Sequence, residues 1–246
     1  YNFSGLIVNY IWQSRLTKCN IPIKAIFTHD VFAYRDERIA VGKNWHHHSV
    51  AEEAKAVRRF SHILAIQDIE RDYFNFLSPN SNVLSVYSSF AFVEQPITGN
   101  KNILFFSGGN YLNVEAINYF ISNVFNKLLQ HDNAIHLLIG GNICSAFSPN
   151  EIHPNIELKG RYDNPDDFYL LGDIVINPVS KGTGLKIKTL EALAHGKVTI
   201  TDPHSAAGIY DATNAPLKVA HTPDEYMKAI LHYMQQPQAI ILNQTQ

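Results

Sequence analysis

The chain has 246 residues, of which 46% are hydrophobic and 17% are charged, and its formal net charge is −2. This composition is that of an ordinary folded protein and excludes a disordered tail. The near-neutral charge argues against nucleic acid as a partner, because binding to a phosphate backbone requires a concentrated surface of lysine and arginine. Cys19 and Cys144 lack a partner motif, which excludes a disulfide scaffold and fits a reducing compartment.

No apolar run has the length needed to span a bilayer, and no charged-then-apolar leader opens the chain. We therefore expect a cytoplasmic protein, for which peripheral contact with the inner face of the cell membrane stays open. The chain starts without methionine and enters a strand-like apolar run almost at once. We expect that further sequence precedes it.

Strand-like and helix-like segments alternate along the chain. In chain order, the predicted strands are residues 5–11, 23–28, 62–67, 82–87, 102–107, 134–140, 155–160, 173–178, 197–202 and 215–220. Apolar residues at helical spacing lie between most of them, at 50–60, 68–77, 113–129, 164–171, 184–194 and 223–234. This alternation predicts parallel sheets covered by helices on both faces, which is a doubly wound α/β architecture.

A connecting segment, residues 86–101, lacks a helical period and contains proline and glycine. We therefore expect two Rossmann-like domains, at residues 1–95 and 96–246. The second has enough strands to be complete. The first contains the first four predicted strands and is expected to be the C-terminal part of a domain.

The most informative segment is KGTGLKIKTLEALAHGK, residues 181–197, which lies between two predicted buried strands. At about 100° per residue, one polar stripe of the predicted helix contains Gly184, Lys188, Glu191 and His195. The opposite, apolar face contains Ile187, Leu190, Leu193 and Ala194. This pattern predicts that the apolar face packs on a core while the polar stripe faces a cleft or solvent.

A glycine-rich loop before a helix suits a phosphate, because unpaired backbone N–H groups attract an anion and glycines let it approach. The loop contains Gly182, Thr183 and Gly184, and Lys188 could reach the same charge. Glu191 could accept hydrogen bonds from two vicinal hydroxyls, such as those of a ribose. This order predicts a nucleotide diphosphate along the helix. The alternative is a solvated polar face with an ordinary lysine–glutamate pair.

Other predicted strands also end in residues suited to ligand binding. Glycines follow two strands of the second domain, at residues 106–113 and 139–142, and a His-Asp pair lies within residues 27–35 of the first. In open α/β sheets, ligands bind beyond the carboxyl ends of the strands. We therefore expect these ends to form the rim of a crevice, with the cleft between the two domains as the binding site.

Four blocks of sequence resemble a known family. They are THDVFAYR, EEAKAVRRFSHILAIQDIERDYF, NILFFSGGNYLNVEAINYF and GDIVINPVSKGTGLKIKTLEALAHGK, and together they resemble the GT-B glycosyltransferases of the family 4 type. These are retaining enzymes that use nucleotide sugars. The resemblance implies two Rossmann-like domains that face each other, with the donor nucleotide mainly on the second domain and the acceptor mainly on the first.

The resemblance also implies roles for individual residues. Those that would hold the donor are Gly108, Gly109, Gly182, Thr183, Gly184, Lys186, Lys188 and Glu191. Among them, Glu191 would bind the ribose and Lys188 would also act in catalysis. His29 and Asp30 are the other catalytic candidates and would face the transferred sugar. The sequence departs from the family at Thr183, where many members have a second glutamate, and in GGNYLNVEA, where an arginine and lysine pair is missing.

The predicted function is transfer of a sugar from a nucleotide-sugar donor to a glycan or lipid-linked acceptor in bacterial surface polysaccharide or glycoconjugate synthesis. Lys188 and the helix N–H groups would stabilise the charge that develops on the leaving β-phosphate. The alternatives are a non-catalytic nucleotide-sugar-binding or partner module, another GT-B enzyme such as a sugar-nucleotide epimerase, and an α/β domain whose polar stripe binds nothing.

Two further segments are given structural interpretations. The run WHHHS at residues 45–49 suggests a metal, but adjacent histidines cannot all point one way and no ligand-spaced carboxylate or cysteine accompanies them. We therefore predict neither a metal site nor a cofactor. The aromatic-rich NYFISNVF, residues 118–125, is predicted to be a core stripe of a helix.

Overall fold

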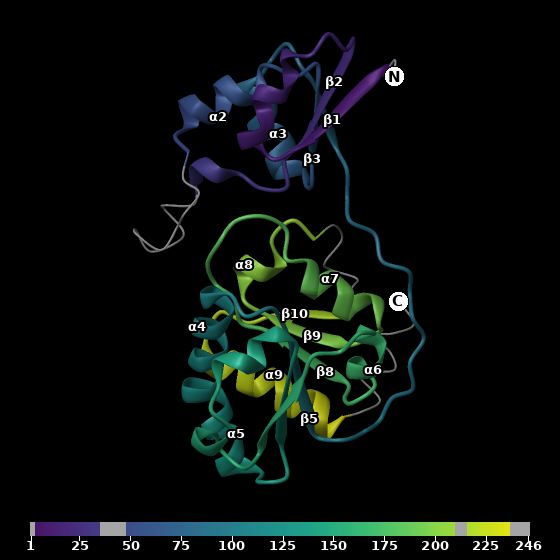
Figure 1. Ribbon diagram of the computed structural model, residues 1–246. Helices are drawn as coiled ribbons and strands as arrows, with labels where there is room; N and C mark the ends of the chain where they lie inside the picture. Colours follow the sequence, from purple (N-terminus) through teal and green to yellow (C-terminus); the bar gives the residue numbers. More distant parts are fainter. Residues whose placement is uncertain (1–2, 35–47, 210–215, 237–246) are drawn as a thin grey trace. The chain divides into compact units, whose positions relative to one another are not determined.

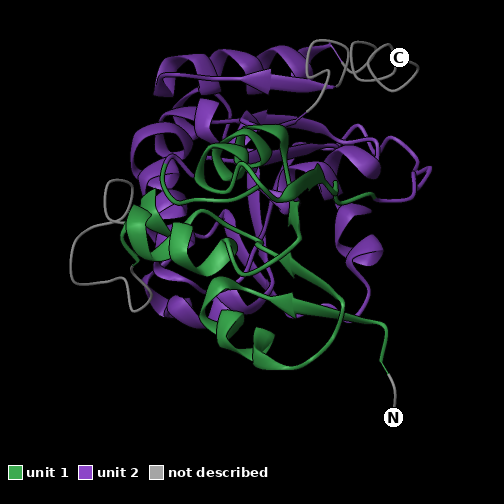
Figure 2. Ribbon diagram, turned by 90° about the horizontal axis from the view of Figure 1, so that it is seen from above, with its two compact units in different colours: residues 1–89, 181–185 green, residues 90–180, 186–246 purple. Residues whose placement is uncertain are grey.

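The computed structural model describes residues 3–34, 48–209 and 216–236. It contains two compact units, which Figure 2 distinguishes by colour. Unit 1 comprises residues 1–89 with 181–185, and unit 2 comprises residues 90–180 with 186–246. The chain thus divides between residues 89 and 90, whereas the sequence predicted a boundary between 95 and 96. The inclusion of 181–185 in unit 1 was not predicted.

Unit 1 is built on a four-stranded parallel sheet in the order β1-β2-β3-β4. The strands are β1 (Gly5–Asn9), β2 (Ile23–Phe27), β3 (His62–Ala65) and β4 (Asn82–Ser85). Its helices are η1 (Ile11–Lys18), η2 (Phe32–Tyr34), α2 (Val50–Val57) and α3 (Asp68–Leu77). All four predicted strands and both predicted helices of this region are confirmed.

The core of unit 1 lies on one face of its sheet. Val8, Ile26, Ile63 and Val83 stand side by side across the four strands and are buried, together with side chains of α2 and α3. Residues on the opposite face are open to solvent: Ile7 is 66% exposed, Ile23 53% and Leu84 46%. Alternation along each strand therefore separates a packed face from an accessible one.

Unit 2 is built on a six-stranded parallel sheet in the order β10-β9-β8-β5-β6-β7. The strands are β5 (Asn102–Phe106), β6 (His136–Gly140), β7 (Ile156–Gly160), β8 (Ile174–Asn177), β9 (Val198–Thr201) and β10 (Leu217–Val219). Counted within the unit and taken from β7, this is the order 3-2-1-4-5-6 of dinucleotide-binding folds. The strand order reverses between β5 and β8, so the crevice of the sheet opens there.

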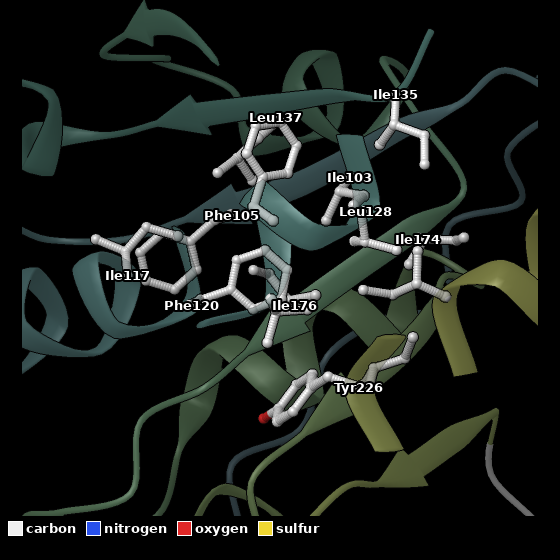
Figure 3. Close-up of a cluster of buried hydrophobic side chains, with 14 of the residues drawn as sticks. Ile103, Phe105, Ile117, Phe120, Leu128, Ile135, Leu137, Ile174, Ile176 and Tyr226 are labelled. Carbon is white, nitrogen blue, oxygen red and sulfur yellow. The ribbon is translucent and has the colours of Figure 1, made fainter. Parts of the chain in front are cut away.

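Helices cover both faces of the unit 2 sheet, as the doubly wound prediction requires (Figure 1). One face packs against α4 (Tyr111–Phe120), η3 (Ile121–Phe125), α5 (Asn126–His131) and α9 (Pro223–Gln235), and Figure 3 shows this larger core cluster. The other face packs against α6 (Pro165–Tyr169) and α7 (Ile187–Ala194). Three short helical segments complete the unit: η4 (Asn142–Ala146), η5 (Pro149–Glu151) and α8 (Pro203–Ala206).

The helix predicted at 113–129 contains a π-helical turn, because η3 follows α4 and precedes α5 without a break. The wider turn allows the consecutive residues Val124 and Phe125 both to be buried, at 1% and 0% exposure. Phe120 is also fully buried, whereas Tyr119 is 49% exposed. The predicted core stripe at 118–125 is therefore confirmed, on a helix less regular than expected.

Glu70 of α3 is a buried carboxylate in unit 1, with 3% exposure. Its Oε1 accepts a hydrogen bond from Gln67 Nε2 at 3.0 Å, and its Oε2 has no partner among the described residues. Burial raises the pKa of Glu70 to about 7, and the nearby Asp30 and Glu53 carboxylates contribute. The folded unit therefore retains a proton that the unfolded chain has lost between pH 4.5 and 7.

Glu70→Gln should accordingly stabilise unit 1 in a pH-dependent manner. A carboxyl whose folded pKa is raised loses its contribution to stability as pH rises through this window, and the glutamine amide does not. We expect the variant to raise the free energy of unfolding by about 2 kcal/mol at pH 8 and by little at pH 4.5. Denaturant unfolding at both pH values measures this. Asp72→Asn, at an exposed position of the same helix, is the control, and an equal gain at both pH values would contradict the account.

Candidate functional site

A pocket of about 500 Å³ lies in unit 2. Its wall consists of Phe106, Ser107, Gly108, Asn110, Asn113, Gly141, Asn142, Arg161, Tyr162, Ile187, Lys188 and Glu191. Phe106 is the last residue of β5, and the others follow β5, β6 and β7 or lie on α7, which follows β8. The pocket is thus at the carboxyl ends of the strands, where the strand order reverses. The segments after the predicted strands were expected to form a binding crevice at this edge.

Lys188 is one of three charged residues of this pocket, with Arg161 and Glu191. Its Nζ donates hydrogen bonds to Asn113 Oδ1 at 2.6 Å and to Ser107 Oγ at 3.1 Å, and lies 5.5 Å from the centre of the Phe105 ring. Burial lowers the pKa of Lys188 to about 7, and the positive charge of Lys186 adds to this effect. Among the described residues, no carboxylate forms an ion pair with this ammonium group.

The amide of Asn113 is held so that its oxygen faces Lys188. Asn113 Nδ2 donates to the carbonyl oxygen of Gly108 at 2.9 Å, and its backbone N–H donates to Asn110 Oδ1 at 3.0 Å. Asn110 is also the N-cap residue of α4. The bond to Gly108 fixes the orientation of the amide, and its oxygen, the only acceptor of the side chain, faces the lysine. The loop after β5 and the first turn of α4 therefore surround the ammonium group with neutral oxygens.

Glu191 lies one turn after Lys188 on α7 and lines the same pocket. Tyr169 OH donates a hydrogen bond to Glu191 Oε2 at 3.1 Å. Lys188 and Glu191 therefore share one pocket, as their spacing on the helix predicted. A cation and a carboxylate one turn apart could contact an anionic group and neighbouring hydroxyls of one ligand.

Two glycines, Gly141 in the pocket wall and Gly109 next to it, are needed for close packing. A Cβ on Gly141, whose φ is +96°, would overlap the carbonyl oxygen of Ser107. A Cβ on Gly109 would lie 3.2 Å from the carbonyl oxygen of Asn142. Gly108 differs, since a Cβ there would meet nothing within 4 Å. The structure thus places Gly108 at the open pocket wall and Gly109 against the neighbouring loop.

The predicted phosphate loop does not line this pocket. Gly182, Thr183 and Gly184 belong to unit 1, where Thr183 Oγ1 donates to Asp30 Oδ2 at 2.8 Å. The helix begins at Ile187 and Lys186 is its N-cap residue, so the Gly-Thr-Gly turn does not directly precede the helix as predicted. Positive φ angles at Gly182 and Gly184 account for the glycines of this loop.

His29 and Asp30 follow β2 in unit 1, as predicted. His29 has a φ of +62°, which is rare for a residue other than glycine, and its Nε2 lies 2.8 Å from Asn9 Oδ1. Its ring packs against Tyr10 and Phe27, with ring centres 4.5 and 4.3 Å away. Burial lowers the pKa of His29. Asp30 is buried and its Oδ1 accepts a hydrogen bond from the next backbone N–H, which orders the turn.

Two expectations for the α7 helix are wrong. Ile187, predicted on the apolar face, is 50% exposed, while the deepest positions are Thr189 and Ala192. His195, predicted on the polar stripe, is only 5% exposed, because its ring stacks on Tyr169 and bonds to Asp166. The helix therefore packs on the sheet through a face shifted from the one that hydrophobicity indicated.

Sequence reasoning missed several residues of the pocket wall. They are Ser107, Asn110, Asn113, Gly141, Asn142, Arg161 and Tyr162. Five of them lie within the strand-end segments 106–113 and 139–142, which were predicted to form the rim of a crevice, and Arg161 and Tyr162 follow the predicted strand 155–160. Their residue types carry no distinctive chemistry in the sequence.

The histidine run predicted not to bind metal falls largely outside the described residues, since only His48 is included. Within residues 3–34, 48–209 and 216–236, no group of three or more histidine, cysteine, aspartate or glutamate side chains is placed to hold a metal ion. None of the helices in these ranges has the length and apolar character needed to cross a membrane.

Comparison with solved structures places the chain in a known fold class. A mutant of S. aureus TarM, solved with UDP, α-GlcNAc-glycerol and fondaparinux, has a TM-score of 0.73 at 13% identity, over 97% of this chain and 50% of TarM. HepE of Anabaena, solved with UDP and glucose, has a TM-score of 0.73 at 10% identity, over 98% of this chain and 71% of HepE. Sucrose-phosphate synthase from Thermosynechococcus elongatus has a TM-score of 0.70 at 12% identity, over 96% and 66%.

These likenesses, with two parallel α/β units, define the GT-B fold that the sequence resemblance implied. The chain spans about half the length of TarM. Residues 100–236, more than half of the chain, match the family described as glycosyl transferases group 1. The chain belongs to this family. A search among curated proteins finds no match.

A pair of glycine substitutions tests the packing of the pocket wall. Gly141→Ala should lower the free energy of unfolding by about 2 kcal/mol or more, because the added methyl group overlaps a backbone oxygen at a positive φ. Gly108→Ala, where space is open, should change it by less than about 0.5 kcal/mol. Denaturant unfolding of both variants measures this. Equal losses would show that the loop after β6 does not approach the loop after β5 as described.

Proposed function

We propose that the protein is a glycosyltransferase whose unit 2 binds a nucleotide-sugar donor in the Lys188 pocket. The observation that carries the proposal is a half-buried lysine with neutral hydrogen-bond partners, which shares one pocket with Glu191. A charge removed from water without a counter-ion is costly to the folded state. An anionic ligand offsets that cost, so the pocket favours a ligand with a concentrated negative charge.

The diphosphate of the donor supplies this charge next to Lys188. When the bond from the sugar to the diphosphate breaks, negative charge develops on the departing β-phosphate. The Lys188 ammonium group, held by Asn113 and Ser107, stabilises that charge where it forms. Gly108 presents backbone without a side chain at the pocket wall and gives the phosphates access.

Glu191 is proposed to accept hydrogen bonds from the ribose hydroxyls, since a carboxylate has the acceptor sites for a vicinal diol. Lys186, Gly109 and the loop containing Gly182, Thr183 and Gly184 are further proposed contributors to donor binding. TarM and HepE were both solved with UDP, which makes UDP the first nucleotide to test.

Unit 1 is proposed to bind the acceptor, a glycan or lipid-linked glycan of bacterial surface polysaccharide or glycoconjugate synthesis. His29 and Asp30 would contact the transferred sugar, and transfer with retention of configuration follows from the family resemblance. A lipid-linked acceptor would bring the protein to the inner face of the cell membrane as a peripheral protein.

Binding of nucleoside diphosphates tests the donor site. We expect UDP, or one of GDP, ADP and CDP, to raise the melting temperature of the wild type, because a ligand that binds only the folded state stabilises it. Lys188→Met should weaken the affinity for that nucleoside diphosphate by about 10- to 100-fold, the size expected for a charge-assisted hydrogen bond. Lys127→Met, at an exposed lysine, is the control. Binding without turnover of any nucleotide sugar would favour the non-catalytic module, and binding of no nucleotide would contradict the proposal.

Proton uptake gives a second test of Lys188. Its folded pKa of about 7 leaves it mostly neutral at pH 8, and a bound diphosphate favours the charged form. Binding at pH 8 should therefore take up roughly one proton, whereas at pH 6 the lysine is already charged and this uptake disappears. Calorimetry in two buffers of different ionisation enthalpy measures the uptake. Persistence of the pH 8 uptake in Lys188→Met would assign the proton to another group.

A further inference from the structure

We infer that Tyr169, supported by His195, is a positioning residue that fixes the Glu191 carboxylate for the ribose of the donor. The inference rests on the proposed function and adds to it two residues that do not line the pocket. Its starting point is the 3.1 Å hydrogen bond from Tyr169 OH to Glu191 Oε2. Because Tyr169 occupies only one lone pair of Oε2, Glu191 can still accept hydrogen bonds from two hydroxyls, through Oε1 and the other lone pair of Oε2.

Tyr169 is itself held in one place. It is fully buried, in a cluster that includes Leu104, Phe168 and Ala192. Burial and the adjacent Glu191 carboxylate raise its pKa well above the usual range of tyrosine, so the hydroxyl keeps its proton and acts as a donor. A hydrogen bond from such an immobile donor holds the Glu191 side chain in one rotamer.

His195 stacks on the phenol ring of Tyr169 and holds that ring in place. The two rings stack, with centres 4.3 Å apart and planes inclined by 29°. His195 Nε2 lies 2.8 Å from Asp166 Oδ1, and Nδ1 lies 2.7 Å from the carbonyl oxygen of Glu191. Each ring nitrogen thus has an oxygen partner, which fixes the orientation of the ring.

The chain of contacts joins two helices at the pocket. Asp166 and Tyr169 lie three residues apart on α6. Asp166 bonds to His195, at the end of α7, and Tyr169 bonds to the side chain of Glu191, within α7. The backbone and the side chain of Glu191 are thereby fixed by separate residues. A phenylalanine at 169 would fill the same space and keep the stacking, so the hydroxyl can be tested apart from the packing.

The experiment compares the affinity for the nucleoside diphosphate that the wild type binds with that for its 2′,3′-dideoxy counterpart. Tyr169→Phe should lose about 3- to 10-fold in affinity for the ribose form and less than 2-fold for the dideoxy form. Glu191→Ala should abolish the preference for ribose, and adding Tyr169→Phe to it should cause no further loss. Tyr226→Phe is the control, because this buried tyrosine lies on the other face of the sheet. It should leave the ratio of the affinities for the ribose and dideoxy forms unchanged.

The outcomes separate this inference from the proposed function. Failure of the wild type to bind any nucleoside diphosphate overturns the proposed function, and with it the basis of the inference. Binding with an unchanged ribose preference in Tyr169→Phe, or with equal losses for both ligands, overturns the inference alone. If Tyr169→Phe does not fold, Asp166→Asn replaces it, since that side chain is 43% exposed. It should lower the ribose preference about 2- to 3-fold through His195, and an unchanged preference overturns the inference.

Discussion

The site depends on the partial removal of the Lys188 ammonium group from water, among neutral oxygens. Asn113 and Ser107 satisfy its hydrogen bonds, yet neither supplies a negative charge. Desolvation therefore disfavours the charged form, and the pKa of the lysine falls to about 7. We propose that a bound anion supplies the negative charge that Asn113 and Ser107 do not.

Sheet topology brings these groups together. β5 and β8 are neighbours in the sheet, and the strand order reverses between them. The loop after β5 and the helix after β8 consequently meet at the same edge of the sheet. Glycine at position 141 lets the loop after β6 close against Ser107. The pocket is therefore a product of strand order and close backbone packing, and a few side chains give it charge.

Much of this could be predicted from the sequence. The ten strands are short apolar runs between polar or glycine-containing turns, and all ten are present in the described residues. Lys188 and Glu191 share a pocket because their spacing is local. The contact between Lys188 and Asn113 was beyond prediction, since it joins residues 75 positions apart. The same holds for His195. Its position on the helix predicted an exposed side chain, but it is buried because it bonds to Asp166 and stacks on Tyr169.

The most direct test of the central claim is a crystal structure of the protein with UDP bound. We expect a phosphate oxygen at hydrogen-bond distance, about 3 Å, from Lys188 Nζ, with the ribose hydroxyls on Glu191. UDP in a different pocket, or in this pocket with its phosphates turned away from Lys188, would contradict the assignment of the half-buried lysine to the donor diphosphate.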